Sequence, residues 1–289
     1  MIHTIKSNEL TVKINDFGAE LISAVGADGY EYIWDGKEHW DGHAPILFPA
    51  CGRILNNTYT LGGVEYHMGA HGFAMKNAFE VAVKTDSRLT LALKSSDETK
   101  KMYPFDFIFT ADFEIQGNRL IVNFTVQNND KKVMPYMVGW HPAFTLDHAN
   151  GARVEDYSLK FNTDKDLVCY QVLPTCFVSH EGIDYHVKNG TYVLNEKEIY
   201  DNDSMLFSGT GEHAVLSAEG EAHSLDFSWS ENLPYFCIWK APDSKAMFVC
   251  LEPWTNLPGE GEEENFDTKD LSRLPAGKSA TYTYVAKFL

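Results

Sequence analysis

Residues 105–115 read Phe-Asp-Phe-Ile-Phe-Thr-Ala-Asp-Phe-Glu-Ile, and this stretch decides the fold class. Its apolar side chains stand at every odd position, so an extended strand buries one face and leaves the other in water. Gly117 and Asn118 follow as a turn, and apolar residues alternate again over 120–126. Two alternating runs joined by such a turn predict an antiparallel β-hairpin.

The same period of two recurs along the chain. It predicts further strands at 10–15, 20–25, 79–84, 88–94, 155–161, 213–218, 223–229, 236–240, 246–252 and 279–287. Helical periodicity is almost absent, apart from a turn or two at 97–102. Many short alternating strands with little helix are typical of stacked sheets, so we predict an all-β fold, a large antiparallel β-sandwich. No internal repeat and no Pro/Ser-rich linker divides the chain, so residues 1–289 are predicted to form a single domain.

The composition excludes several classes of partner. The 289 residues carry 41 Asp and Glu against 24 Lys and Arg, for a net charge of −17. A nucleic-acid surface needs a basic stripe, and no Lys/Arg cluster here is denser than a pair. No stretch approaches the roughly 18 apolar residues that a membrane-spanning helix requires. We therefore expect neither nucleic acid nor a membrane as a partner, and nothing in the sequence indicates the oligomeric state.

The five cysteines bear on the cellular compartment. They are odd in number, widely spaced and without a Cys-x-x-Cys pair. Secreted domains stapled by disulfides usually carry an even set of cysteines, so reduced thiols are expected here. The N-terminal residues 1–6 also lack the apolar core of a signal peptide. The sequence therefore predicts a cytoplasmic protein.

Two short motifs suggest a metal or a cofactor only at first sight. His67 and His71 have the spacing of a zinc-binding pair, but that spacing places both rings on one face only in a helix. Gly69 lies between them, in a chain that is otherwise β. Residues 209–214 fit the letters of a dinucleotide-binding loop, yet an alternating strand follows them where a helix is needed. We therefore expect no metal and no cofactor.

Chemistry is indicated by four segments in which polar functional residues stand among aromatic residues, prolines and glycines: 47–53, 71–74, 139–144 and 251–256. His141 and Glu252 each precede a proline, which disfavours the helical region and holds the residue extended. Each also has a tryptophan nearby, Trp140 and Trp254 respectively. A fixed backbone beside a flat apolar ring is a reasonable way to aim an ionisable group at a sugar.

These segments resemble the signature stretches of the aldose 1-epimerase (galactose mutarotase-like) family, particularly its LacX-type branch. The resemblance covers most of the chain and rests on Phe-Pro-x-x-Gly-Arg at 48–53, His-Gly-Phe-Ala at 71–74 and His-Pro-Ala-Phe at 141–144. Together the three blocks are specific; each alone is modest. The chain departs from the pattern at Met75, where a basic residue is expected.

A looser fifth block is Tyr-Asp-Asn-Asp-Ser-Met-Leu-Phe at 200–207. In the family this block supplies an aspartate that binds sugar hydroxyls. Both Asp201 and Asp203 are candidates for that role, and we favour Asp203.

The resemblance implies a supersandwich fold and interconversion of the α and β anomers of a free aldose. Opening a pyranose ring requires a base at the anomeric hydroxyl and an acid at the ring oxygen, without a cofactor. By resemblance Glu252 is the base and His141 the acid, and we expect the former ionised and the latter cationic at working pH. The remaining expected contacts to the sugar substrate are hydrogen bonds from Arg53 and His71, a hydroxyl contact from Asp203, and stacking on Trp140 and Trp254.

Two alternative functions stay open. An epimerase acting on hexose 6-phosphates needs additional cations, and the chain has only five arginines, an acidic composition and Met75. A sugar-binding protein without turnover needs the aromatic rings but not an acid–base pair. Both alternatives are therefore less favoured than an epimerase of free sugars. The particular aldose is not indicated.

Overall fold

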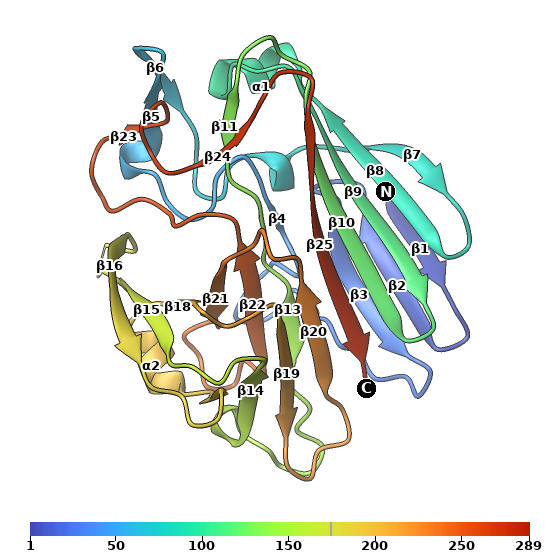
Figure 1. The fold of residues 1–289 in the computed structure, drawn as a ribbon. Helices are drawn as coiled ribbons and strands as arrows, with labels where there is room; N and C mark the ends of the chain where they lie inside the picture. The colour runs from blue at the N-terminus through green and yellow to red at the C-terminus, as the bar shows by residue number, and fades with distance from the viewer. Residues whose placement is uncertain (174) are drawn as a thin grey trace.

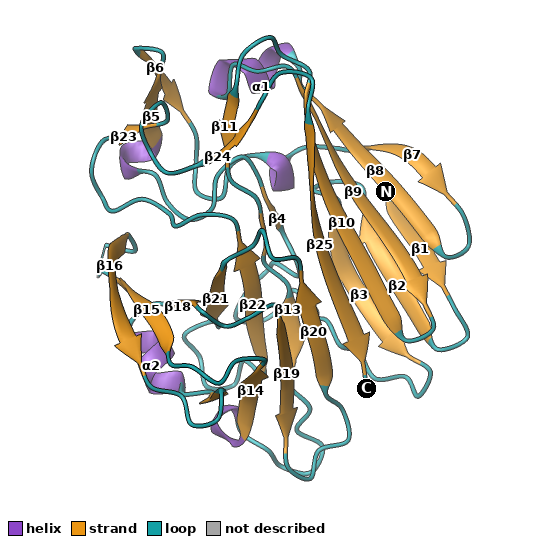
Figure 2. Ribbon diagram, in the orientation of Figure 1, coloured by secondary structure: helices purple, strands orange, loops and turns teal. Residues whose placement is uncertain are grey.

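The protein is built from two large antiparallel sheets packed against each other, with smaller sheets at one side and one end (Figures 1 and 2). The computed structural model describes residues 1–173 and 175–289. The predicted all-β sandwich is confirmed. Among the described residues, every ladder between named strands is antiparallel except β23 with β5.

The larger sheet has nine strands and contains the hairpin from which the fold was predicted. Its centre is formed by the last strand of the chain, which pairs on both sides with strands from earlier segments. In spatial order the strands are β17 (Thr191–Val193), β14 (Tyr157–Phe161), β19 (His213–Ala218), β20 (Leu225–Trp229), β25 (Ser279–Phe288), β10 (Arg119–Asn128), β9 (Phe107–Gln116), β8 (Arg88–Lys94) and β7 (Glu80–Lys84).

The second sheet has eight strands, and one of them pairs outside the main order. Strand β13 (Ala143–Thr145) pairs with β22 alongside β12. In spatial order the other strands are β16 (Val178–Tyr185), β15 (Leu167–Val172), β18 (Met205–Ser208), β21 (Tyr235–Trp239), β22 (Phe248–Trp254), β12 (Gly139–Trp140) and β4 (Ile46–Leu47).

Smaller elements surround these two sheets. The additional strands are β1 (Ile2–Lys6), β2 (Leu10–Asn15), β3 (Glu20–Gly26), β5 (Thr58–Leu61), β6 (Val64–His67), β11 (Met134–Tyr136), β23 (Glu264–Asn265) and β24 (Ser272–Leu274). The helices are α1 (Asp97–Met102), α2 (Glu196–Asp201) and the 3₁₀ turns η1 (Leu55–Asn57), η2 (Ala74–Lys76) and η3 (Val154–Asp156). No helix within the described ranges is both long enough and apolar enough to cross a membrane.

The β9–β10 hairpin follows the sequence prediction closely. Gln116 pairs with Arg119 across the two-residue turn, and the odd-numbered residues of 105–115 are all buried. The opposite face of β9 is less exposed to solvent than the alternation alone indicates. Asp112 is buried there because it accepts hydrogen bonds from Arg88 at 2.9 Å and from Thr90 at 2.5 Å. A buried carboxylate with two such partners is satisfied and does not disturb the strand.

The short helix α1 also lies where the sequence places it. The hydroxyl of Ser96 accepts a hydrogen bond from the backbone N–H of Thr99, and the Thr99 hydroxyl accepts one from the N–H of Ser96. This reciprocal capping box satisfies two backbone donors at the start of the helix.

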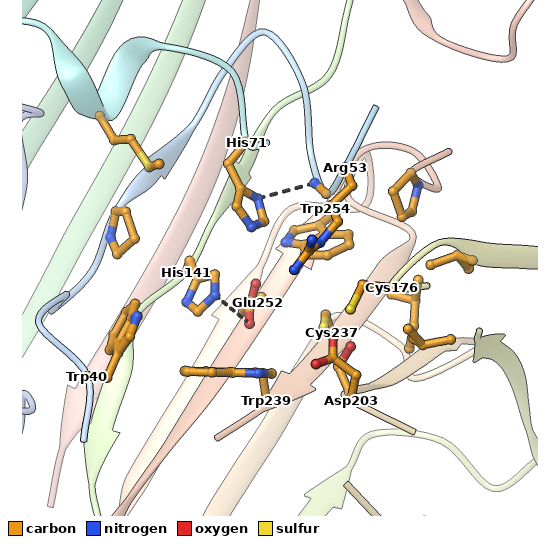
Figure 3. Close-up of a pocket in the computed structure, with 18 residues that line it drawn as sticks. Trp40, Arg53, His71, His141, Cys176, Asp203, Cys237, Trp239, Glu252 and Trp254 are labelled. Atoms are coloured by element: carbon orange, nitrogen blue, oxygen red, sulfur yellow. Dashed lines mark hydrogen bonds and ion pairs between the residues drawn. The ribbon is translucent and has the colours of Figure 1, made fainter. Parts of the chain in front are cut away.

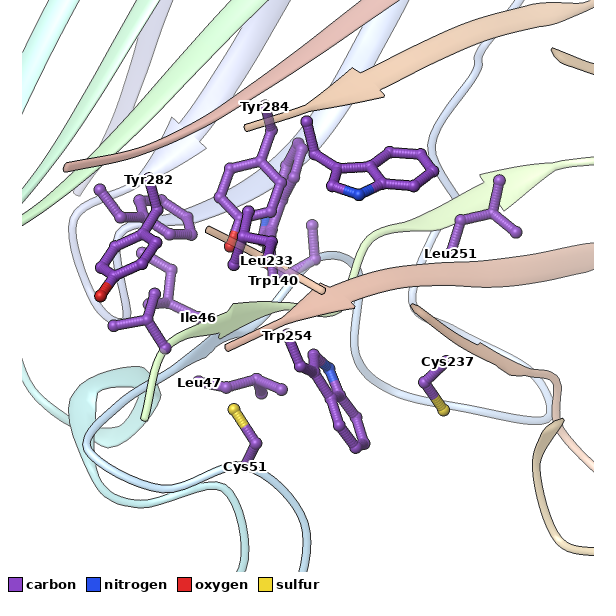
Figure 4. Close-up of a cluster of buried hydrophobic side chains, with 14 of the residues drawn as sticks. Ile46, Leu47, Cys51, Trp140, Leu233, Cys237, Leu251, Trp254, Tyr282 and Tyr284 are labelled. Atoms are coloured by element: carbon purple, nitrogen blue, oxygen red, sulfur yellow. Dashed lines mark hydrogen bonds between the residues drawn. The ribbon is translucent and has the colours of Figure 1, made fainter. Parts of the chain in front are cut away.

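The main hydrophobic core lies between the two large sheets (Figure 4). Its contacts are largely aromatic. The ring of Trp140 from the eight-stranded sheet lies 5.4 Å from that of Tyr284 and 6.2 Å from that of Phe124, both in the nine-stranded sheet. Phe124 in turn packs on Phe109 at 5.6 Å. These rings bury large apolar areas and hold the two sheets face to face.

Strand β10 offers a direct test of this core. We expect Phe124→Ala to lower the free energy of unfolding by about 3–5 kcal/mol, because the lost ring leaves a cavity between the sheets. Gln127 lies on the same strand but is exposed, so Gln127→Ala should change stability by less than about 0.5 kcal/mol. Urea unfolding of both variants makes the comparison. Equal losses would show that Phe124 is not part of a tightly packed core.

Candidate active site

A cavity of about 340 Å³ opens on the eight-stranded sheet. Its floor is a row of side chains from neighbouring strands. Leu206 of β18 pairs with Cys237 of β21, and Cys237 pairs with Glu252 of β22. All three residues line the cavity, together with His141. Because cross-strand partners project to the same side of a sheet, the register of the ladder assembles this floor.

His141 reaches Glu252 through an interrupted ladder. Gly139 pairs with Trp254, and Ala143 pairs with Cys250. His141 is midway between Gly139 and Ala143 and therefore faces Glu252, which is midway between their partners. The prolines after both residues lack an N–H and cannot complete the ladder here.

The backbone around His141 is held by other partners. Its N–H donates to the carbonyl of Pro45 at 3.0 Å, and the Leu251 N–H donates to the carbonyl of Pro142 at 3.2 Å. The interruption thus separates β12 from β13 but keeps their common register. The His-Pro dipeptide at 141–142 and the Glu-Pro dipeptide at 252–253 therefore lie opposite each other on adjacent strands.

The two ionisable groups are close and enclosed (Figure 3). Nε2 of His141 lies 3.3 Å from Oε1 of Glu252, and the side chains are 11% and 1% exposed. Both carboxylate oxygens of Glu252 and Nδ1 of His141 have no hydrogen-bond partner among the described residues. The pair is therefore free to bond a molecule that enters the cavity.

Burial controls the charge of this pair. It raises the pKa of Glu252 well above its usual 4.5, and the nearby indole of Trp254 opposes this only in part. Burial likewise lowers the pKa of His141 to about 3, with a smaller contribution from His71. Two buried charges need further hydrogen bonds to offset their lost hydration, and this pair has none. Burial without such bonds therefore acts against the expected state, with ionised Glu252 and cationic His141, and favours the neutral form of each group.

His71 lies in the loop between β6 and η2 with a positive φ of 61°. The Gly52 N–H donates to its Nδ1 at 3.2 Å, and the His71 N–H donates to the Gly52 carbonyl at 2.9 Å. Because Nδ1 accepts, the proton of the neutral ring is on Nε2. Enclosure in the cavity wall lowers the pKa of His71 to about 4, and the charges of Arg53 and Lys76 act in the same direction. His71 is thus a neutral hydrogen-bond donor.

The next residue gives a physical reason for the His-Gly order of this loop. A Cβ on Gly72 would lie 2.3 Å from the carbonyl oxygen of Phe48, and its φ is 73°. Only glycine fits so close an approach at a positive φ. Gly72 therefore lets the loop pack on Phe48 and carry His71 to the cavity.

Arg53 and Asp203 also line the cavity, from loops that follow β4 and α2. Asp203 has a φ of 60°, which turns the chain from the end of α2 toward β18. Asp201 instead forms an ion pair with Lys197 on the exposed side of the helix. Of the two candidate aspartates, Asp203 is the one placed at the cavity.

A buried lysine anchors the helix that precedes Asp203. The Lys240 ammonium lies 2.8 Å from the Glu196 carboxylate and donates to the Tyr200 hydroxyl at 2.7 Å and to the carbonyl of Asp243 at 2.9 Å. Its side chain is fully buried. Helix α2 is thereby tied to the turn after β21, and this fixes the chain that leads to Asp203.

Trp140 does not lie at the cavity, and its expected role in sugar stacking is corrected. It is fully buried between the sheets, where its indole N–H donates to the carbonyl of Ala44 at 3.1 Å. The reason is the strand period of two. Trp140 adjoins His141 and therefore points to the opposite face, whereas Trp254 is two residues from Glu252 and lines the cavity with it.

Several lining residues were not predicted from the sequence. The ring of Trp40 stacks on His141 at a centroid distance of 5.2 Å, and Trp239 meets the same imidazole edge-on at 5.6 Å. Trp239 could have been found from the β21 alternation once Cys237 was known to face the cavity. Trp40 lies in an aperiodic loop, and no local signal indicates its position.

Three further expectations from the sequence concern Met75, His67 and the cysteines. Met75 lines the cavity with a thioether where the resemblance suggested a cation. His67 lies apart from His71, on β6, where its ring contacts Thr58 and Glu65. All five cysteines are free thiols, as expected.

The placement of Trp140 can be tested. Trp140→Phe removes the hydrogen bond to Ala44 and leaves unfilled volume, so we expect a loss of about 1–3 kcal/mol in stability. The affinity for sugar should remain unchanged. Trp254→Phe, which alters the cavity wall, should weaken it. Chemical denaturation and calorimetry measure the two effects. A loss of affinity in Trp140→Phe equal to that in Trp254→Phe would contradict the placement.

Known proteins resemble this chain in sequence and in structure. The chain is 29% identical over 282 residues to the chromosomal protein LacX of Lactococcus lactis subsp. lactis, with 90% of each chain covered. A galactose mutarotase related enzyme from Lactobacillus acidophilus superposes with a TM-score of 0.93 at 28% identity, covering 100% of this chain and 97% of the other. A galactose mutarotase-like protein from Lactobacillus casei ATCC 334 also gives 0.93, at 30% identity and full coverage of both chains.

The family comparison spans nearly the whole sequence. The sequence model of the family described as aldose 1-epimerase matches residues 1–285. The signature blocks quoted above lie within that match. The protein belongs to the aldose 1-epimerase family.

Proposed function

We propose that the protein is a mutarotase that interconverts the α and β anomers of a free hexose. The observation that carries this proposal is the 3.3 Å contact between His141 and Glu252 on the floor of an open cavity. Neither carboxylate oxygen has another partner among the described residues. Family membership supports sugar epimerisation as the general activity.

The reaction needs two coupled proton transfers. Glu252 takes the proton of the anomeric hydroxyl, and the electron pair of that O–H bond forms the C1–O1 carbonyl. The C1–O5 bond breaks, and O5 takes a proton from His141. The open-chain aldehyde then rotates about C1–C2, and both transfers reverse on its other face.

The environment of the pair suits this sequence of steps. Ring opening converts ionised Glu252 and cationic His141 into their neutral forms, which are the forms that burial favours in this structure. The open-chain stage is thereby stabilised relative to the charged pair. Hydroxyl groups of a bound sugar would donate to Glu252 and return the pair to its charged form. The closed-ring stage, with a charged pair, and the open-chain stage, with a neutral pair, thus become closer in free energy.

The remaining lining residues have complementary roles. Nε2–H of His71 and the guanidinium of Arg53 would donate hydrogen bonds to sugar oxygens and to developing negative charge at O1. Asp203 would accept hydrogen bonds from sugar hydroxyls. The indoles of Trp40, Trp239 and Trp254 provide apolar walls, replacing Trp140 in the expected stacking role.

The charges of the cavity favour an unphosphorylated substrate. Among the described lining residues Arg53 is the sole Arg or Lys, and it stands with the two carboxyl groups of Asp203 and Glu252. A sugar phosphate normally requires a cluster of cations, and Met75 does not supply one. Comparing glucose with glucose 6-phosphate by anomer-resolved NMR would distinguish the two substrate classes.

The same proposal extends to domain organisation and location. We propose that residues 1–289 act as one domain, because the cavity draws on residues from Trp40 to Pro258. We also propose a cytoplasmic location, because all five cysteines are free thiols.

The acid–base pair can be tested by conservative substitution. We expect Glu252→Gln and His141→Asn each to lower kcat by about 10²–10⁴-fold, since each removes one proton-transfer group. Sugar binding measured by calorimetry should survive. The assay is polarimetry of freshly dissolved α-galactose and α-glucose, corrected for spontaneous mutarotation.

Matched controls are available on β6. Glu65 and His67 are 65% and 74% exposed and lie outside the cavity. Glu65→Gln and His67→Asn should therefore keep full activity. Full activity in Glu252→Gln would refute the assigned base. Sugar binding by the unaltered protein without accelerated mutarotation would favour a sugar-binding protein.

The pH dependence of activity follows from the two shifted pKa values. The lowered pKa of His141 disfavours a second proton on the pair, and the raised pKa of Glu252 disfavours loss of the only one. The usual pKa values are 4.5 for glutamate and 6.5 for histidine. Because burial moves the two values in opposite directions, the pair holds a single proton between pH 4.5 and 6.5 and also outside this range on both sides. We expect kcat/KM to be flat over that range. A decline centred near the usual pKa of histidine would contradict the role of burial.

A further inference from the structure

A third residue lies against the acid–base pair and has no part in the proposed proton transfers. Cys250 precedes Glu252 by two residues in β22, so the two side chains share one face of the strand. One ligand atom each from His141, Cys250 and Glu252 lie within 4.8 Å of one another, and all three residues are enclosed. Cys250 pairs with Ala143 of β13 on one side and with Trp239 of β21 on the other, and it is fully buried.

The polar atoms of this cluster have no other partners. Both oxygens of Glu252 and Nδ1 of His141 are buried and make no hydrogen bond to a described residue. Buried polar atoms are normally satisfied, so three unpartnered atoms in one place indicate a position where a ligand can bond. The cavity above the cluster provides a route for a small ion.

The donor set selects the kind of ion. An imidazole, a thiolate and a carboxylate are the three ligand types of zinc, and catalytic zinc sites combine three protein ligands with one exchangeable position. Zinc–ligand bonds of about 2.0–2.3 Å place tetrahedral ligands about 3.3–3.8 Å apart, so small side-chain adjustments suffice. Magnesium and calcium prefer oxygen-only surroundings and do not match a sulfur ligand.

We propose that His141, Cys250 and Glu252 form a binding site for a borderline-soft divalent cation, represented by Zn²⁺, and that the bound cation inhibits the enzyme. The cation replaces the protons of the thiol and of the carboxyl group, which are released to solvent. Its fourth position faces the cavity. The proposed reaction needs no metal, and the cation blocks it by occupying both proton-transfer groups. Binding stands on the geometry alone, whereas inhibition also rests on the proposed function.

A Cys250 variant can distinguish cation binding from mutarotation. It belongs to the cation site but not to the catalytic pair, so Cys250→Ser should keep the metal-free rate of mutarotation. The zinc concentration for half-inhibition should rise at least tenfold, because a neutral hydroxyl is a much weaker zinc ligand than a thiolate. Cys250→Ala serves as the second variant if a buried serine prevents folding. Cys237→Ser, which changes a neighbouring thiol of the cavity floor, is the matched control and should keep the sensitivity to zinc.

The experiment measures binding and inhibition separately on the full-length protein. Zinc is titrated by calorimetry, Co²⁺ by its thiolate charge-transfer absorption, and mutarotation by polarimetry, with each variant normalised to its own metal-free rate. We expect one cobalt ion per chain with a thiolate band that Cys250→Ser abolishes and Cys237→Ser retains. Mg²⁺ at the same concentration should neither bind nor inhibit.

Several results would overturn the proposal. A cobalt band that persists in Cys250→Ser and disappears in Cys237→Ser would assign the cation to the other thiol. Absence of zinc binding would reject the site. Zinc binding at Cys250 with unchanged mutarotation would reject inhibition. If the metal-free protein shows no mutarotation, the proposed function fails, and the cobalt band still decides whether the site exists.

Discussion

The ladder between β22 and the β12–β13 segment is the constraint on which the site depends. Its register places His141 across from Glu252, and the prolines that follow them interrupt the pairing without shifting it. The backbone of His141 bonds to Pro45 instead. Two residues more than a hundred positions apart are thereby held 3.3 Å from each other. The sandwich core beneath keeps both strands in place, because Trp140 anchors the reverse face.

Burial gives this contact its chemical character. A pair of opposite charges would ordinarily stay charged at so short a distance, yet removal from water without compensating hydrogen bonds favours the neutral forms. The same unpartnered atoms make the pair reactive toward a sugar and, with Cys250, receptive to a soft cation. Proton transfer and metal binding therefore draw on one feature: polar atoms left unsatisfied at the floor of an open cavity.

Much of the fold was predictable because alternation is a local property. Strand β8 and helix α1 lie at the predicted residues, and the long hairpin lies within two residues of its prediction. Strands β15, β16 and β18 were missed. Half-exposed or exposed residues interrupt the alternation in β15 and β16, and β18 is only four residues long. Their extended form depends on pairing with neighbours distant in the sequence, which no local pattern reveals.

By itself, the sequence determined the all-β class, the family and the identity of the two candidate proton-transfer residues, because alternation and short motifs are written in consecutive positions. Tertiary structure decided the rest. It places the side chain of Trp140 in the core and that of Trp40 at the cavity. Asp203 lines the cavity, whereas Asp201 pairs with Lys197 on the surface. Burial of the catalytic pair also shifts both pKa values against the expected charges. Side-chain direction, burial and charge depend on which strands become neighbours, and that is settled only when the chain folds.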